Sequence, residues 1–177
     1  MDLPVGRGKK FLGGVDGIAD RLVSGWGLSG ISSFQSGFPI PMLALPTQLS
    51  TLFNAGVPRP NVTAGCDQAV SGAAQAKLNA WFNTSCFTQP SAFGFGNASR
   101  TSSIARTQGI ANWDLSLYKN TRITERIGLT YRAEVYNLAN RVQFNPPGNQ
   151  AGSSTFGVVS GQLNSPRIIQ MALRLTF

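Results

Sequence analysis

Apolar and polar side chains alternate strictly along the last residues of the chain. From Ile169 to Phe177 every odd position carries a large apolar side chain, and the even positions between them are polar or small. A period of two indicates a β-strand with one apolar face and one polar face. The pattern therefore predicts a strand over residues 166–177, which ends on an aromatic carboxy-terminus. Its apolar face holds Ile169, Met171, Leu173, Leu175 and Phe177.

Two more strands are predicted in the middle of the chain. Between Arg126 and Leu138 the odd positions are mostly apolar, and the charged residues fall on even positions. Residues 113–118 alternate in the same way. The polar link at residues 119–122 has the length and composition of a tight turn. We therefore expect two antiparallel strands joined by a hairpin turn at residues 119–122.

The remaining local signals are weaker. Residues 26–35 alternate less regularly and predict a further strand, while residues 1–5 are interpreted as the tail of an earlier one. Short helical turns are expected at residues 16–23 and 73–82. No repeat at a fixed period accompanies these elements.

Two long stretches lack any sustained periodicity. More than seventy residues separate the strand at 26–35 from the strand at 113–118, and residues 141–165 form a second such stretch. Loops of this length are uncommon in a compact soluble domain, whereas a barrel has short turns on one side and long loops on the other. If the turn near residue 120 faces the periplasm, both loops face outward and Phe177 ends on the periplasmic side.

The composition favours a membrane barrel. Only 12% of the residues are charged, about half the usual share for a soluble protein. Lipid penalises charge on the outer face of a barrel, and a polar lumen occupies the inner face. No apolar stretch of about 20 residues predicts a transmembrane helix. The fold class expected is all-β: an antiparallel transmembrane β-barrel fragment of about four to five strands with long extracellular loops.

Charge and chemistry give little support for other functions. The formal charge of +8 raises nucleic acid as a partner, but among the basic residues only Arg7, Lys9 and Lys10 are clustered, and we expect no nucleic-acid binding. The chain has no His and only seven acidic residues spread along its length, so no general base or paired carboxylates suggest an active site. We expect neither enzymatic activity nor a cofactor or metal.

The two cysteines, Cys66 and Cys86, lie in a polar stretch of the first long loop. Two Cys without His cannot complete a zinc site, so a disulfide formed outside the cytoplasm is favoured over two free thiols. Loop closure by such a bond is worth on the order of 3 kcal/mol.

Short motifs occur in a fixed order over nearly the whole chain. They are Asp2-Leu3-Pro4-Val5-Gly6-Arg7-Gly8, Gly25-Trp26-Gly27-Leu28-Ser29-Gly30-Ile31, Arg59-Pro60-Asn61, Trp81-Phe82-Asn83, Phe95-Gly96-Asn97, Asp114-Leu115-Ser116-Leu117, Arg132-Ala133-Glu134, Tyr136-Asn137-Leu138, Phe156-Gly157, Pro166-Arg167 and the ending Ala172-Leu173-Arg174 to Phe177. In these motifs and their spacing the sequence resembles the C-terminal end of the Oar-like, carboxypeptidase-regulatory-domain-containing TonB-dependent receptors.

This resemblance implies that residues 1–177 are the C-terminal portion of a larger barrel domain in the outer membrane of a Gram-negative-type bacterium. The N-terminus also lacks the charged start and apolar run of a signal peptide, so we expect the true beginning to lie upstream. The partners implied are outer-membrane lipid, the barrel-assembly machinery, the rest of the barrel with its plug, and an energy-coupling TonB-type protein. The final strand resembles the assembly signal of such barrels, with Phe177 as the terminal aromatic above Leu175, Leu173 and Met171. For the inner positions, ordinary lipid-facing alternation is an equal alternative.

The function expected is uptake of an unknown substrate across the outer membrane by the whole protein. A surface-exposed structural or adhesive barrel and a soluble secreted β-sandwich are the alternatives. We expect three charged residues to face the lumen as an internal charge network rather than a substrate path: Arg132, Glu134 and Arg174. Four aromatic residues of the first loop are expected to pack that loop rather than contact a ligand: Trp81, Phe82, Phe93 and Phe95.

Overall fold

The computed structural model describes residues 1–177. The chain folds into two compact units. One unit, called the sheet unit below, comprises residues 1–34, 111–141 and 165–177. The other, called the loop unit, comprises residues 35–110 and 142–164.

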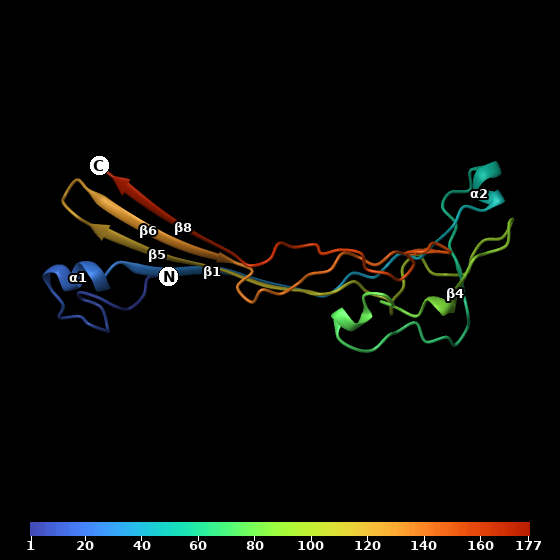
Figure 1. Ribbon diagram of the computed structural model, residues 1–177, viewed down its shortest axis with the longest axis horizontal. Coiled ribbons are helices and arrows are strands. Elements are labelled where there is room, and N and C mark those ends of the chain that lie inside the picture. The colour runs from blue at the N-terminus through green and yellow to red at the C-terminus, as the bar shows by residue number, and fades with distance from the viewer. The chain divides into compact units, whose positions relative to one another are not determined.

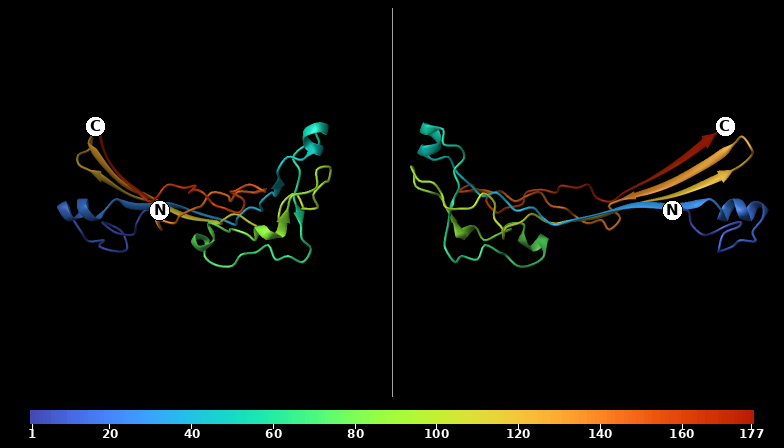
Figure 2. Two further views of the ribbon diagram at one scale, coloured as in Figure 1. Left: turned by 45° about the vertical axis from the view of Figure 1, so that its right-hand side comes forward. Right: turned by 180° about the vertical axis from the view of Figure 1, so that it is seen from behind.

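Four strands form the central sheet. They are β1 (Trp26–Gln35), β5 (Ile110–Arg122), β6 (Gly128–Tyr136) and β8 (Ile168–Thr176), and they lie in the order β1-β5-β6-β8. Figure 1 shows them side by side, and the gold, orange and red strands β5, β6 and β8 stay adjacent in both views of Figure 2. The strand pattern of the sequence is thereby confirmed. No helix in the structure is long and apolar enough to cross a membrane.

The register of the sheet keeps the two faces chemically distinct. Leu117 lies opposite Ala133 and Tyr131 lies opposite Leu173, so odd positions pair with odd positions from β5 to β8. At β1 the backbone of Gly27 closely approaches the Tyr118 ring. Because side chains alternate along each strand, the apolar odd positions of β5, β6 and β8 share one face. The polar even positions share the other.

The hairpin turn lies further along the chain than the sequence predicts. Residues 119–122 belong to β5, where Lys119 pairs with Tyr131 and Arg122 pairs with Gly128. The turn occupies residues 123–127, and the backbone N–H of Ile123 donates to the carbonyl of Ile127 at 2.9 Å. The prediction of a turn at 119–122 was therefore wrong, because residues with polar side chains at the end of a membrane strand still pair through their backbone N–H and C=O groups.

A short strand end precedes β1. Asp2 forms an antiparallel bridge with Gly27, and the backbone N–H of Leu3 donates to the carbonyl of Trp26 at 2.9 Å. The segment then turns back through helix α1 (Gly17–Val23) before β1 begins. The predicted helical turn at residues 16–23 is confirmed, and the pairing agrees with the interpretation of residues 1–5 as the tail of a strand.

The loop unit contains short elements. Helix α2 (Gln48–Phe53) begins after Thr47 and is followed by its C-cap Asn54, whose φ of 51° is left-handed. The two-residue strands β2 (Leu43–Ala44) and β7 (Gln150–Ala151) pair in parallel, and β3 (Asn61–Val62) pairs antiparallel with β4 (Phe87–Thr88). The helical turn expected within residues 73–82 forms as the 3-10 turn η1 (Ala74–Lys77), and a second 3-10 turn, η2 (Thr84–Cys86), follows it.

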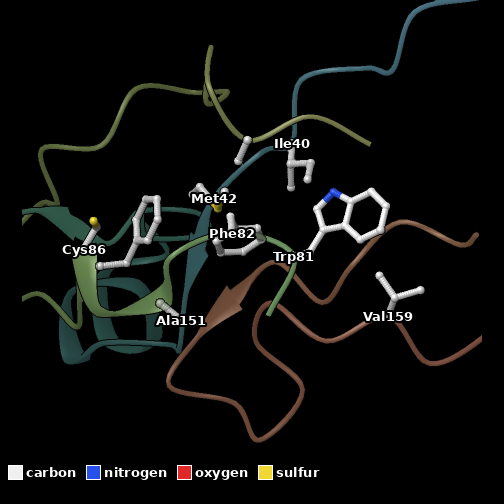
Figure 3. Packing of buried hydrophobic residues seen from close by; sticks show 9 residues of the cluster. Ile40, Met42, Trp81, Phe82, Cys86, Ala151 and Val159 are labelled. Carbon is white, nitrogen blue, oxygen red and sulfur yellow. The ribbon is translucent and has the colours of Figure 1, made fainter. Parts of the chain in front are cut away.

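The buried core of the protein lies in the loop unit. Figure 3 shows Phe82 and Met42 at its centre, beside Cys86 and Ala151. Phe82 is only 1% exposed, and its ring makes edge-to-face contacts with Phe87 at 5.8 Å and Phe156 at 5.1 Å. The long loops are therefore packed against a core of their own, and aromatic contacts of this kind add to the free energy gained from apolar burial.

Candidate functional site

The polar face of the sheet contains a hydrogen-bonded network around Glu134. This carboxylate forms an ion pair with Arg132 at 3.5 Å and accepts a hydrogen bond from the Tyr136 hydroxyl at 3.2 Å. The side-chain amide of Gln170, directly opposite on β8, also donates to it. Two donors on β6 and one on β8 therefore stabilise the negative charge of Glu134.

The structure brings two of the three predicted lumen charges together and separates the third. Arg174 shares the polar face but lies opposite Thr130, whereas Arg132 lies opposite Ala172. Beside the Glu134 network the face is hollowed by a pocket of about 370 Å³, whose lining includes Asp114. The arrangement can hold a polar group, but the charges nearest to it already have partners.

The apolar face carries aromatic residues at both ends of β1. At one end the Trp26 ring meets Tyr131 edge-to-face at 6.5 Å, and the ammonium of Lys119 lies 5.0 Å from the centre of the Trp26 ring. At the other end Phe34 meets Trp113 at 5.2 Å. An apolar band between two aromatic girdles is the outer surface of a transmembrane barrel.

The last strand lies at an edge of the sheet. Every residue of β8 is exposed, including Met171, Leu173 and Leu175 on the apolar face. Phe177 is 96% exposed just beyond the strand. Lipid could not tolerate the unpaired backbone groups of such an edge, so this edge requires a further strand.

Asn137 organises the end of β6 nearest the long loops, which the sequence analysis noted only as part of a resemblance. Its φ of 51° reverses the chain, and its side-chain amide donates to the carbonyls of Arg141 and Ser165, each at 3.2 Å. Its backbone N–H donates to the Asp114 carboxylate at 2.8 Å. Among residues other than Gly, Asn is enriched in left-handed backbone, so an Asn directly after a predicted strand is the sequence signal that could have found this position.

The structure joins Cys66 and Cys86 by a disulfide, which agrees with the pairing predicted from the sequence. Cys86 is fully buried in the core of the loop unit, next to Phe87. The backbone N–H of Thr63 donates to the Cys86 carbonyl at 2.9 Å. The bond therefore links a surface turn of the first loop to its aromatic core.

The four loop aromatics divide into two pairs. Trp81 and Phe82 are buried, and the Trp81 indole N–H donates to the carbonyl of Arg106 at 2.7 Å. Phe93 and Phe95 are exposed, and Phe95 lines a pocket of about 260 Å³ with Arg59. The expectation that these residues pack the loop against itself or its neighbours holds for Trp81 and Phe82. Phe93 and Phe95 do not pack against the rest of this chain, and packing against neighbouring loops stays a prediction for them.

No group of three or more His, Cys, Asp or Glu side chains is arranged to hold a metal ion.

An antiparallel sheet with one polar face, one apolar face, aromatic ends and long loops defines a transmembrane β-barrel protein. A family model for the outer membrane beta barrel domain matches residues 1–170, so the chain belongs to that family and to the outer membrane. Comparisons with curated proteins and with solved structures gave no match.

Proposed function

We propose that residues 1–177 are the C-terminal portion of a TonB-dependent, Oar-like transporter that imports a substrate across the outer membrane. One observation carries this proposal: the two long loops fold together into one unit with its own core rather than into open coil, and a disulfide closes part of the first loop. A rigid loop surface favours solute recognition because little conformational entropy is lost on binding.

The sheet supports a role within a larger barrel. Four strands leave unpaired edges, and closure of a barrel removes such edges. The polar face with Arg132, Glu134 and Arg174 would contact the plug, and the energy-coupling partner would act through the N-terminal part of the whole protein. The barrel-assembly machinery would recognise the strand that ends at Phe177. In this proposal the chain binds and passes a solute and catalyses no reaction.

An adhesive barrel is the second candidate, and the exposed Phe93 and Phe95 favour it. Two aromatic rings on an outer loop beside Arg59 are suited to contact with another macromolecule, since aromatic and Arg side chains are enriched at interfaces. Such a barrel would need neither a plug nor an energy source.

A growth comparison separates the two functions without knowledge of the substrate. Strains lacking this protein, lacking the energy-coupling protein, or lacking both are grown on a panel of single nutrient and metal sources. Transport predicts at least one source on which all three strains share a growth defect of the same size. If the strain lacking only this protein grows as well as the parent strain on every source but attaches less to surfaces, transport is contradicted and adhesion is supported.

A further inference from the structure

The connection between the N-terminal strand end and β1, residues 6–25, exposes four large apolar side chains. Ile18 is 78% exposed and Leu22 is 66% exposed on helix α1, and Phe11 and Leu12 are exposed before it. Ile18 and Leu22 are four residues apart, so they lie on one face of the helix. Four exposed large apolar side chains within twelve residues of the chain mark an interaction surface.

The backbone that carries these side chains is held in place. Residue Gly6 approaches Ser24 so closely that a Cβ at position 6 would lie 2.0 Å from the Ser24 hydroxyl. That hydroxyl accepts from the backbone N–H of Arg7 at 2.9 Å and donates to the Asp20 carboxylate. The ammonium of Lys119 donates to the Ser24 carbonyl at 2.6 Å. The apolar surface is therefore a fixed feature of the fold.

Positive charge accompanies the apolar surface. Lys9, Lys10 and Arg21 are exposed cations of the connection. Of its two acidic residues, Asp16 forms an ion pair with Arg7 at 3.6 Å and Asp20 accepts from Ser24. Exposed apolar residues with nearby Lys and Arg are typical of segments that lie in the interface of an anionic bilayer.

The connection is continuous with the lipid-facing side of the sheet. Trp26 belongs to the apolar face, and its indole N–H donates to the Leu22 carbonyl at 3.0 Å. The connection lies at the same end of the sheet as the short turn at residues 123–127, because Asp2 pairs with Gly27 at the beginning of β1. Short turns of outer-membrane barrels lie on the periplasmic side.

We propose that this connection is a membrane-interface anchor on the periplasmic leaflet of the outer membrane. Phe11, Leu12, Ile18 and Leu22 lie among the upper acyl chains, and the nearby cations lie at anionic phospholipid headgroups. Trp26 marks the boundary at which the strand leaves the hydrocarbon, since indole rings favour that depth. The occupant of the apolar surface is therefore phospholipid rather than another protein segment.

Site-directed spin labels in the whole assembled barrel, in vesicles of phosphatidylethanolamine and phosphatidylglycerol, test the proposal. Ile18→Cys and Leu22→Cys variants are labelled with the Cys66–Cys86 disulfide intact, so that the introduced thiol is the free one. The control is Ala19→Cys, whose side chain is turned about 80° around the helix from the midpoint of positions 18 and 22. Relaxation by oxygen, which concentrates in lipid, is compared with relaxation by a water-soluble nickel chelate. Leu173→Cys serves as the lipid-facing standard, and the comparison uses preparations in which it reports lipid.

The expected result is lipid-like relaxation at positions 18 and 22 and a clearly higher nickel accessibility at position 19. High nickel accessibility at positions 18 and 22 would overturn the proposal in favour of a solvated surface. Low accessibility to both reagents would overturn it in favour of a protein partner, either another strand of the barrel or a second copy of the chain.

A second measurement tests the headgroup charge. The label at position 18 is placed in a Leu22→Ala background, which weakens docking so that docked and undocked populations are both visible. Replacing Lys9 and Lys10 by Gln should lower the docked-to-undocked ratio by about fivefold per lysine in the anionic vesicles, and should leave it unchanged in phosphatidylcholine vesicles. An equal effect in both lipids would overturn the assignment to anionic headgroups.

Discussion

Replacing Leu173 by Arg tests whether the apolar face of the sheet contacts lipid. Leu173 is the sixth of nine residues in β8. With a rise of about 3.3 Å per residue and a tilt of about 40°, it lies about 2.5 Å from the middle of the strand along the membrane normal. An Arg on the lipid face near the bilayer midplane costs about 2–4 kcal/mol, which is about 30-fold to 1,000-fold in the unfolding equilibrium.

The matched control is Gln170→Arg on the polar face of the same strand. Gln170 lies opposite Glu134, so a guanidinium there can replace the amide as a donor to that carboxylate. Its unfolding free energy should change by no more than about 1 kcal/mol. Both variants are measured in the assembled barrel by urea unfolding in lipid vesicles, followed by tryptophan fluorescence. Equal losses for the two variants would refute the lipid-facing assignment.

Four further outcomes are expected. Phe82→Ala should destabilise the loop unit by about 3–5 kcal/mol, whereas Phe95→Ala, at a position 77% exposed, should change it by less than about 0.5 kcal/mol; protease resistance of residues 35–110 measures both. Reduction of the Cys66–Cys86 bond should cost the loop unit about 3 kcal/mol, and the reductant should have no effect on a variant that lacks both cysteines. Asn137→Ala should cost about 1–3 kcal/mol and speed hydrogen exchange of the Arg141 backbone N–H, which donates to the Asn137 side-chain oxygen at 2.9 Å, and Asn137→Gly should restore the left-handed backbone but not that protection. Replacing Phe177 by Leu should lower the amount assembled in the outer membrane of cells and leave the unfolding free energy in vesicles nearly unchanged, because Leu keeps an apolar side chain at this lipid-facing position; an equal loss in both assays would argue against the assembly signal.

The strands were predictable because the two faces of each strand contact different environments. The apolar odd positions and polar even positions of residues 126–138 and 166–177 reflect lipid on one side and a polar lumen on the other. The position of the turn was not predictable from the same pattern. Lys119 and Arg122 are polar because the strand is leaving the hydrocarbon there, but their backbones continue the ladder with β6.

The core of the loop unit left no periodic trace in the sequence. Met42, Phe82 and Phe156 come from segments far apart along the chain, so neither a period of two nor a period of 3.6 marks them. The helical turn expected at residues 73–82 extends only to Lys77, because Trp81 and Phe82 are buried in this core. The disulfide was predictable because only two cysteines exist and no His could join them at a metal.

The composition of that core from two loops has a consequence for export. When the chain is exported from its N-terminus, residues 35–110 reach the periplasm before residues 142–164. For that time Phe82 lacks its contact with the ring of Phe156. Both cysteines belong to the earlier segment. A periplasmic oxidant can therefore join the two cysteines while residues 35–110 are still unfolded. The disulfide can form before residues 142–164 are exported and complete the aromatic contacts of the core.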